Sequence, residues 1–285
     1  MYVFGIGCAG FPCSLSTQEQ NNRMSRPYHY LAGVPCWIET LQPDPTAAQH
    51  FYGELFGWTF DEPSTIDGRR SARLRGRTVA GIAQAPEVLP TAVWITYIAV
   101  DVVQDALQRA TDAGATVLAE PVTAGNDRRV AIIADPQGVA IGLSQTKDQG
   151  GAQAINEPGA WTMSALHSAD AQGAAAFYGA VFGWELASRE GWPIGLWRRP
   201  GYAGPHASPA LPPDLVAVLA PTNPDEVPPH WAVNIQVQDV DDAVRHAQML
   251  GATIVVSPVD TPTVRSAAIQ DPQGAVIAIS APPTS

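Results

Sequence analysis

The sequence of 285 residues has little charge, little cysteine and no long apolar run. Charged residues make up 15% of it, against about 25% in average proteins, and its 16 basic and 27 acidic residues give a net charge of −11. Because an acidic protein repels phosphate backbones, we expect no nucleic-acid partner. Because no stretch approaches the ~20 apolar residues of a membrane-spanning helix, we expect no membrane partner.

Cysteine is the second shortage. Cys8, Cys13 and Cys36 cannot form a disulfide framework and have no CxxC spacing, which favours a reducing, cytoplasmic location. The N-terminus starts apolar but lacks the basic leader of a signal peptide, and a polar stretch precedes Met24. We therefore expect residues 1–29 to be a disordered extension or the product of a start codon placed too early.

Apolar residues, proline and glycine are abundant instead. The 46% of hydrophobic residues can build a sizeable core, so intrinsic disorder is not expected. The 26 prolines and 25 glycines exclude a helical bundle and indicate many turns and short strands.

The chain contains two copies of one pattern. HFYGELFGW begins at His50 and AFYGAVFGW at Ala176, while DPQG occupies 135–138 and again 271–274. These blocks recur in the same order about 130 residues apart, a period too long for a solenoid, so they indicate a duplicated domain.

The repeat divides the chain into two domains and a linker. We predict the first domain over residues 30–145, a polar, Gly-rich linker over 146–159 and the second domain over 160–282. The second copy carries an insertion near 193–229 that holds ten prolines, so we predict mostly loop there. Because a long loop in a compact domain is often a lid, this one could cover a cleft in the second copy.

Each copy reads as a strand, a helix and three strands, followed by the same order again. Asp44 offers an N-cap, Pro45 the first helical position and Gly57 a stop for the first helix. Asp101 is expected to cap a helix over 102–113. In the second copy the predicted helices cover 171–182 and 240–250, and the predicted strands cover 160–166, 231–237, 253–257, 264–270 and 275–280.

Three features together indicate a superfamily: two βαβββ units per domain, FYxxxFGW at the end of the first helix, and DPxG before the last strand. In these features the chain resembles the vicinal oxygen chelate superfamily of glyoxalase, bleomycin resistance and extradiol dioxygenase proteins. The resemblance covers about residues 30–282 and is greatest to tandem two-domain glyoxalase-like proteins. It implies an α+β fold in which each domain is a pair of βαβββ units that form a half-open, eight-stranded, barrel-like sheet around a cleft.

The resemblance also implies where a metal would bind. Metal-dependent members hold a divalent cation with His, Gln or Glu side chains from the first, fifth and last strands of a domain. In this chain those positions fall on residues that cannot hold such an ion, namely Trp37, Ile95 and Gly142 in the first copy and Met163, Ala232 and Ala278 in the second. We therefore expect no metal and no other cofactor, and expect these six residues to line a ligand-binding cleft.

Polar side chains on the same strand faces are the candidates for catalysis. Alternation along the strands places Glu39, Tyr97 and Asn234 on the faces that would have held the metal. A Glu in an apolar cleft has a raised pKa, which suits an acid or base, and a Tyr can donate to a developing oxyanion. Glu39 could instead be paired with an Arg and hold the sheet. His230 is the fourth candidate, although a surface residue at the start of a strand is an equally simple interpretation.

Further polar residues are candidates for ligand binding. Arg129 and Arg265 both lie six residues before a DPQG aspartate, and each could anchor a ligand oxygen or form a structural ion pair. Gln236 lies on the same strand face as Asn234. Because only the second copy has the long insertion, we expect the second copy, or a cleft between the domains, to hold the specific ligand.

Three functions for a small-molecule ligand remain open. The favoured one is a metal-independent enzyme that uses acid–base chemistry for isomerisation, cyclisation or elimination of a small oxygenated metabolite of aromatic or polyketide-like type. The second is a non-catalytic protein that sequesters such a compound, as bleomycin-resistance members do. The third is a metal-dependent glyoxalase or dioxygenase. A tandem chain can make internally the contact for which single-domain relatives dimerise, so a monomer and a homodimer both agree with the sequence.

Overall fold

The computed structural model contains two eight-stranded sheets, one from each copy of the repeat, which confirms the α+β class and the tandem arrangement. The predicted extension 1–29 lies, except for its last residue, outside the described part of the chain, as do Cys8 and Cys13. The structure describes residues 29–86, 91–125, 128–147, 150–204, 211–261 and 263–282.

The first sheet has the strand order β2-β3-β4-β1-β5-β8-β7-β6, and its two βαβββ units meet at the centre. There β1 (Pro35–Gln42) runs antiparallel to β5 (Val93–Ala99). Each of them runs parallel to the last strand of its own unit, β4 (Arg77–Gln84) or β8 (Ala140–Thr146), because a helical crossover separates the two strands. The remaining elements are α2 (Pro45–Phe56), β2 (Thr59–Phe60), β3 (Arg70–Leu74), α3 (Val103–Asp112), β6 (Thr116–Ala124) and β7 (Arg128–Ala134).

The second sheet repeats this order position for position, as β10-β11-β12-β9-β13-β16-β15-β14. Its central strands β9 and β13 are antiparallel, as β1 and β5 are. The elements are β9 (Trp161–Ser168), α4 (Ala171–Phe182), β10 (Glu185–Ser188), β11 (Gly195–Arg198), β12 (Leu215–Pro221), β13 (His230–Gln236), α5 (Val240–Met249), β14 (Thr253–Asp260), β15 (Arg265–Gln270) and β16 (Val276–Ala281).

The Pro-rich insertion contains two strands that its composition concealed. β11 and β12 both lie within 193–229, which was predicted to be mostly loop. Proline cannot donate to a sheet ladder, and the two strands contain none except Pro221, the last residue of β12. The prolines therefore mark the connections around these strands.

One helix cap was predicted correctly and one was not. Asp44 accepts hydrogen bonds from the backbone amides of Thr46 and Ala47 at 2.9 and 3.0 Å, and Gly57 ends α2 in the left-handed conformation with φ 71°. The prediction that Asp101 caps α3 is wrong, because the helix begins one residue later and has no side-chain cap of its own. The Gln145 side chain, from β8, accepts the backbone N–H of Val103 instead, at 2.9 Å.

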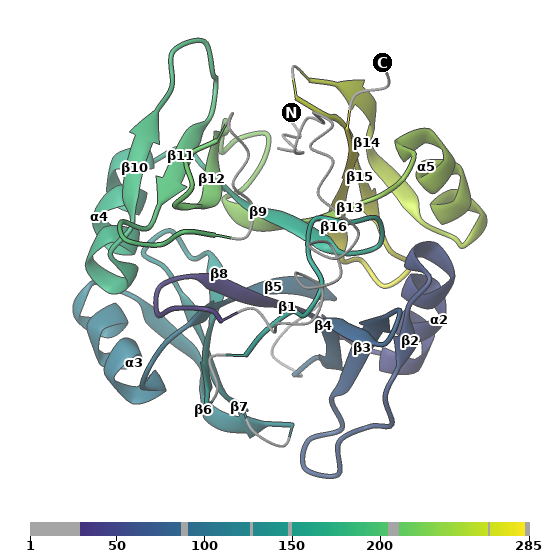
Figure 1. Ribbon diagram of the computed structural model, residues 1–285, viewed down its shortest axis with the longest axis horizontal. Helices are drawn as coiled ribbons and strands as arrows, with labels where there is room; N and C mark the ends of the chain where they lie inside the picture. The colour runs from purple at the N-terminus through teal and green to yellow at the C-terminus, as the bar shows by residue number, and fades with distance from the viewer. Residues whose placement is uncertain are drawn as a thin grey trace, which may run out of the picture.

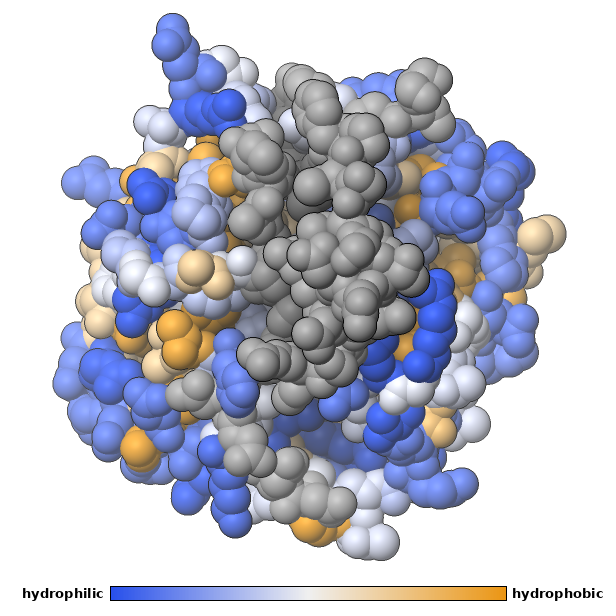
Figure 2. Space-filling view, in the orientation of Figure 1, coloured by the Kyte–Doolittle hydropathy of each residue, from blue (hydrophilic) through white to orange (hydrophobic). Residues whose placement is uncertain are grey.

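The two sheets lie back to back, with their concave faces turned away from each other (Figure 1). Helix α2 of the first domain lies beside α5 of the second, and α3 lies beside α4. Most of the coloured residues in Figure 2 are hydrophilic, and the hydrophobic ones form small separate patches. Among the described helices, none has the length and apolar character needed to cross a bilayer.

The repeated sequence blocks join the two domains. The Tyr52 hydroxyl, from FYG of the first copy, donates to Asp271 in DPQG of the second copy at 2.7 Å. The Tyr178 hydroxyl of the second copy donates to Asp135 of the first at 2.9 Å. Burial, together with the charge of the partner Asp, raises the pKa of both tyrosines well above the ordinary value, so both remain protonated donors.

The tryptophans that end the two FGW blocks make a second reciprocal pair. The Trp58 indole donates to the Gly159 carbonyl at 2.6 Å, and the Trp184 indole donates to the Gly33 carbonyl at 2.5 Å. Asp135 also shapes its own turn, because its other carboxylate oxygen accepts the backbone amides of Gln137 and Val139. One carboxylate therefore shapes a turn and binds the neighbouring domain.

We expect Tyr178→Phe to lower the free energy of unfolding by about 1–3 kcal/mol, because it leaves a buried Asp135 oxygen and the Trp231 indole N–H without a partner. Urea unfolding monitored by circular dichroism measures the change. Tyr52→Phe is expected to act in the same way at the pseudo-equivalent contact. A loss below about 0.5 kcal/mol for both variants would show that the reciprocal contacts do not stabilise the domain pair.

Candidate functional site

The concave face of the first sheet carries one row of residues across its three central strands. Trp37 on β1 lies opposite Tyr97 on β5, and Tyr97 lies opposite Gly142 on β8. Ile95, the predicted fifth-strand position, lies one pair further along, opposite Glu39. The strand register therefore aligns Tyr97, rather than Ile95, with Trp37 and Gly142.

Gly142 is explained by the ring of Tyr97. A Cβ atom at residue 142 would lie 2.2 Å from a ring carbon of Tyr97, a distance that no pair of non-bonded atoms tolerates. Glycine at this position of β8 lets the aromatic ring lie flat against the sheet, where Tyr97 is fully buried. The position that the resemblance assigned to a metal ligand is thus occupied by a neighbour's side chain.

Glu39 lies in the floor of this face and is 3% exposed. The Tyr97 hydroxyl donates to Glu39 Oε2 at 2.9 Å, and the Arg69 guanidinium donates to Oε1 at 3.1 Å. The surroundings of Glu39 are therefore not apolar, and the alternative of a Glu paired with an Arg describes its contacts. Residue 81 of the neighbouring strand is a glycine because a Cβ there would lie 2.7 Å from Glu39 Oε1.

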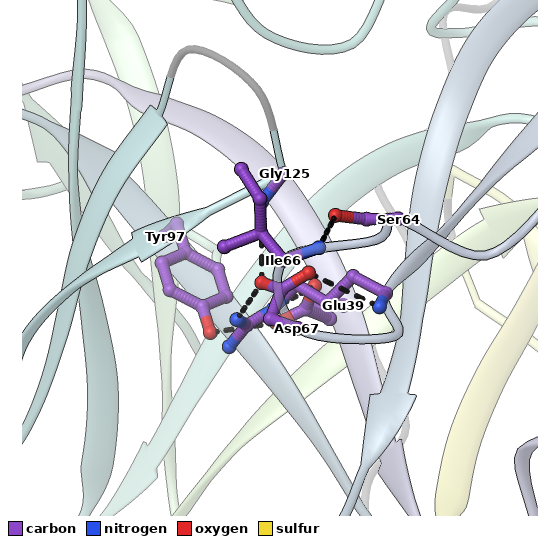
Figure 3. Close-up of polar contacts among 7 residues, drawn as sticks. Glu39, Ser64, Ile66, Asp67, Tyr97 and Gly125 are labelled. Atoms are coloured by element: carbon purple, nitrogen blue, oxygen red, sulfur yellow. Dashed lines mark hydrogen bonds and ion pairs between the residues drawn. The ribbon is translucent and has the colours of Figure 1, made fainter.

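Asp67 holds Arg69 in place from the other side. Arg69 donates to Asp67 Oδ2 at 2.6 Å, and the same oxygen accepts the Gly125 backbone amide at 3.1 Å, so that Asp67, Glu39 and Tyr97 converge (Figure 3). Burial alone would lower the pKa of Arg69, but the charges of Glu39 and Asp67 outweigh it and raise that pKa above its ordinary value. Arg69 is therefore a permanent cation beside Glu39.

Tyr97 completes the group as a neutral hydroxyl. Burial raises its pKa well above the ordinary value, and the charge of Glu39 raises it further, against a smaller opposing effect of Arg69. The hydroxyl therefore stays protonated at neutral pH and donates to Glu39. A buried carboxylate with a fixed cation and a neutral hydroxyl is an arrangement that can accept a proton from a ligand.

Glu39 and Arg69 lie in the floor of a cavity of about 520 Å³. Trp37 and Glu39 line it from β1, and Arg69 lines it from the loop before β3. On the β7 side, Arg128 lines it with its guanidinium carbon 4.2 Å from the centre of the Trp37 ring. The volume fits a small metabolite, and charged groups and an indole form its floor and wall.

The two predicted arginine anchors lie elsewhere. Arg129 is exposed and, by alternation along β7, lies on the opposite face from Arg128. Arg265 donates to Asp241 of α5 at 2.7 and 2.9 Å, and it also forms an ion pair with Asp260. Arg265 therefore forms a structural ion pair, which was its alternative interpretation. In the first domain, Arg128, the residue before Arg129, lines the cavity instead.

The corresponding row on the second sheet is Met163, Asn234 and Ala278. Met163 packs with Ile194, Leu196 and Leu215 in an apolar cluster that Ala232 also contacts. The Asn234 amide is 4% exposed, and neither its oxygen nor its nitrogen has a hydrogen-bond partner. Gln236 is partly buried at the end of β13, where its backbone carbonyl accepts the Gly159 amide. Among the described residues, this face is far more apolar than that of the first domain.

His230 has a partner that the sequence did not indicate. Its ring stacks on that of His167, across from it on β9, with ring centres 4.4 Å apart. Burial, together with the charge that a protonated His230 would place beside it, lowers the pKa of His167 to about 3. Burial also lowers the pKa of His230, so both rings are neutral at neutral pH.

A larger groove of about 950 Å³ lies between the domains, beside the end of α2 and the start of α5. Its lining includes Arg75, Gln238, Asp239 and Asp242, all of which are exposed. The smaller first-domain cavity has the buried carboxylate and buried indole that a specific site requires, so it is the candidate site.

Sequence reasoning missed Arg69, Asp67, Arg128 and His167. Asp67 and Arg69 belong to a loop with no periodic pattern, so nothing in the sequence predicted that they lie near Glu39. Arg128 shares a strand face with Val130 and Ile132, but Ala131 and Ile133 on the other face are apolar as well, so alternation did not distinguish it from Arg129.

A family model described as the Glyoxalase/Bleomycin resistance protein/Dioxygenase superfamily matches the chain twice, over residues 37–143 and 162–279. "Putative glyoxylase CFP32" of Mycobacterium bovis is 33% identical over 267 residues, which cover 91% of this chain and 98% of the relative. "Anthracycline biosynthesis protein DauV" of Streptomyces sp. strain C5 is 30% identical over 264 residues, which cover 86% of this chain and 92% of the relative.

Solved structures with low sequence identity share the fold. The Mn(II)-bound glyoxalase from Novosphingobium aromaticivorans has a TM-score of 0.58 at 18% identity, with 88% of this chain and 82% of that chain covered. The 2,3-dioxygenase LapB from Pseudomonas sp. KL28 has a TM-score of 0.57 at 14% identity, with 90% and 94% covered.

The divalent metal of such folds does not fit the side chains found here. The first-domain row consists of an indole, a phenol hydrogen-bonded to Glu39, and a glycine. The second-domain row consists of a thioether, an amide and a methyl group. Within the described ranges, no three His, Cys, Asp or Glu side chains gather closely enough to hold a metal ion.

We expect Gly142→Ala to destabilise the first domain by about 1–3 kcal/mol, because the new methyl group displaces the Tyr97 ring. Urea unfolding measures the loss. Gly150→Ala is the matched control, because a Cβ there meets no atom within 4 Å. Equal stabilities of the two variants would contradict the close packing of Tyr97 on Gly142.

The buried His167 predicts a pH dependence of stability. The unfolded imidazole protonates near 6.5 and the folded one near 3, so the unfolded state binds the proton first as the pH falls. Stability from this group is therefore complete above pH 6.5 and is lost towards pH 3, at about 1.4 kcal/mol per pH unit. Urea unfolding at several pH values should show a shallower dependence for His167→Gln, whereas the exposed control His50→Gln keeps the wild-type slope. Parallel curves for wild type and His167→Gln would contradict the prediction.

Proposed function

The chain belongs to the Glyoxalase/Bleomycin resistance protein/Dioxygenase superfamily, and within it we propose a metal-independent enzyme of secondary metabolism whose site is the first-domain cavity. Its substrate is a small oxygenated metabolite of aromatic or polyketide-like type. The reaction is an isomerisation, cyclisation or elimination that needs proton transfer to and from the substrate.

The observation that carries this proposal is the buried Glu39 carboxylate in the cavity floor, bound by the Tyr97 hydroxyl and the Arg69 guanidinium. Arg69 donates to Oε1 and holds the carboxylate in the cavity floor. Glu39 then takes a proton from the substrate. The oxygen that we assign to this step is Oε1, which lies beside Gly81, a residue with no side chain to cover it. The neutral Tyr97 hydroxyl holds Oε2 and orients the carboxylate.

The relatives support the substrate class. Two Streptomyces proteins of similar length, DauV and DnrV, are named anthracycline biosynthesis proteins. A chain that aligns with them over nearly its whole length is well suited to a related oxygenated metabolite.

Sequestration without chemistry is the second candidate, and one observation favours it. Arg69 and Tyr97 donate to the two oxygens of Glu39, so the carboxylate has a structural role whether or not it moves a proton. A binding protein needs only the shape and polarity of the cavity.

Glu39→Gln separates the two functions. A thermal-shift screen of aromatic and polyketide-like metabolites finds a ligand, and mass spectrometry follows its conversion by the wild-type protein. We expect Glu39→Gln to reduce turnover by about 10²–10⁴-fold with affinity nearly unchanged, because the amide cannot accept a proton. Glu54→Gln, on the exposed side of α2, is the control and keeps full turnover.

Two outcomes would contradict the proposal. Unchanged turnover in Glu39→Gln refutes its role as a base. Tight binding to the wild-type protein without conversion of any bound compound supports sequestration.

A further inference from the structure

We propose that the first-domain cavity recognises an anionic oxygen, a carboxylate or phenolate, on a planar ligand, and that Arg128 stacked on Trp37 is the residue that binds it. This inference rests on the proposed function for the location of the ligand. It adds the charge and shape of the substrate, and it names a specificity residue outside the acid–base group.

Arg128 differs from Arg69 and Arg73, which also line the cavity. The charge of Arg69 is balanced by Glu39 and Asp67, and Arg73 donates to both oxygens of Asp61 at 2.6 and 2.9 Å. For Arg128 the structure gives the Trp37 ring as a contact and, among the described residues, no carboxylate partner. In a chain of net charge −11, an arginine without an acidic partner inside a cavity is available for an anionic ligand.

The position of Arg128 over the indole also suits a flat partner. Its guanidinium carbon lies 4.2 Å from the centre of the Trp37 ring, and this contact restrains the planar group whose N–H donors form a fork. A carboxylate accepts two parallel N–H bonds from such a fork, and a phenolate accepts one. Because the stack holds the guanidinium before binding, little side-chain freedom is lost when an anion binds.

Trp37 gives independent support for an incomplete site. It is 3% exposed, and its indole N–H has no partner. Nearly all buried donors in folded proteins are paired, so an unpaired one in a cavity wall indicates a partner that the chain does not supply. A Cβ on Gly81 would lie 3.1 Å from this nitrogen and 2.7 Å from Glu39 Oε1. The Trp37 donor and the Glu39 acceptor therefore both lie next to Gly81, which has no side chain.

This arrangement gives the ligand a polarity. An anionic oxygen lies against Arg128, over the Trp37 ring, and a proton-bearing atom lies towards Glu39, two residues along β1. Repulsion by Arg128 excludes cationic ligands, although the net acidity of the protein attracts them. The cavity and the surface as a whole therefore differ in the charge that they favour.

Isothermal titration calorimetry with salicylate and its neutral isostere salicylamide tests the inference. We expect the wild-type protein to bind salicylate at least about tenfold more tightly than salicylamide, because only the anion pairs with the guanidinium. Arg128→Gln abolishes this preference, and Arg128→Lys, which keeps the charge but loses the fork, retains part of it. Arg109→Gln, at an exposed position on α3, keeps the wild-type preference. Circular dichroism confirms that each variant is folded.

Three results would overturn the inference: no binding of salicylate, equal affinity of the wild-type protein for both compounds, or an unchanged preference in Arg128→Gln. The titration measures equilibrium binding and needs no turnover, so it fails independently of the proposed chemistry. If the anion preference depends on Arg128 while Glu39→Gln keeps full turnover, the recognition stands and the acid–base role falls. If Glu39→Gln loses turnover and the preference is absent, the chemistry stands and anion recognition falls.

Discussion

The structure depends on one contact made twice, a buried tyrosine hydroxyl of one domain donating to the DPQG aspartate of the other. Each aspartate uses its second oxygen to hold its own turn before the last strand of its sheet. The last strand, the turn and the partner's first helix are thereby fixed together. Because the contact is reciprocal, neither domain can rotate against the other without breaking both bonds and uncovering two buried carboxylates.

This constraint determines where a site can lie. The residues that join the domains lie on the helices, the turns and the inner faces of the sheets, where Thr96 also contacts Ser164 at 2.7 Å. The concave faces are turned outward and take no part in joining the domains. A change in a concave residue therefore costs only local packing. The two faces differ accordingly: in the same row, one carries Trp37, Tyr97 and Gly142, and the other carries Met163, Asn234 and Ala278.

Much of this architecture is encoded locally and could be predicted from the sequence. The repeat established two copies, and helix 171–182 was predicted to the residue because Asp170 and Gly183 mark both of its ends. The predictions that failed depended on contacts between residues that are far apart in the sequence. The cap of α3 comes from β8, and the partner of Glu39 comes from a loop thirty residues away. Whether Arg128 or Arg129 faces the cavity depends on the phase of β7, which a count back from the DPQG turn does not determine.

The group around Glu39 shows how a fold can use its central row without a metal ligand. In the chelating pattern, a cation holds the ligand oxygens and neutralises the charge that develops on them. Here the positive charges come from guanidinium groups, Arg69 beside the carboxylate and Arg128 over the indole, and a glycine at 142 leaves room for a phenol where a ligand residue would stand. The charge of Arg69 is already balanced by Glu39 and Asp67, so it cannot also neutralise the charge of a substrate. In the proposed chemistry, Arg128 over the indole is the arginine that would neutralise an anionic intermediate, so the proposal depends on Arg128 as well as on Glu39.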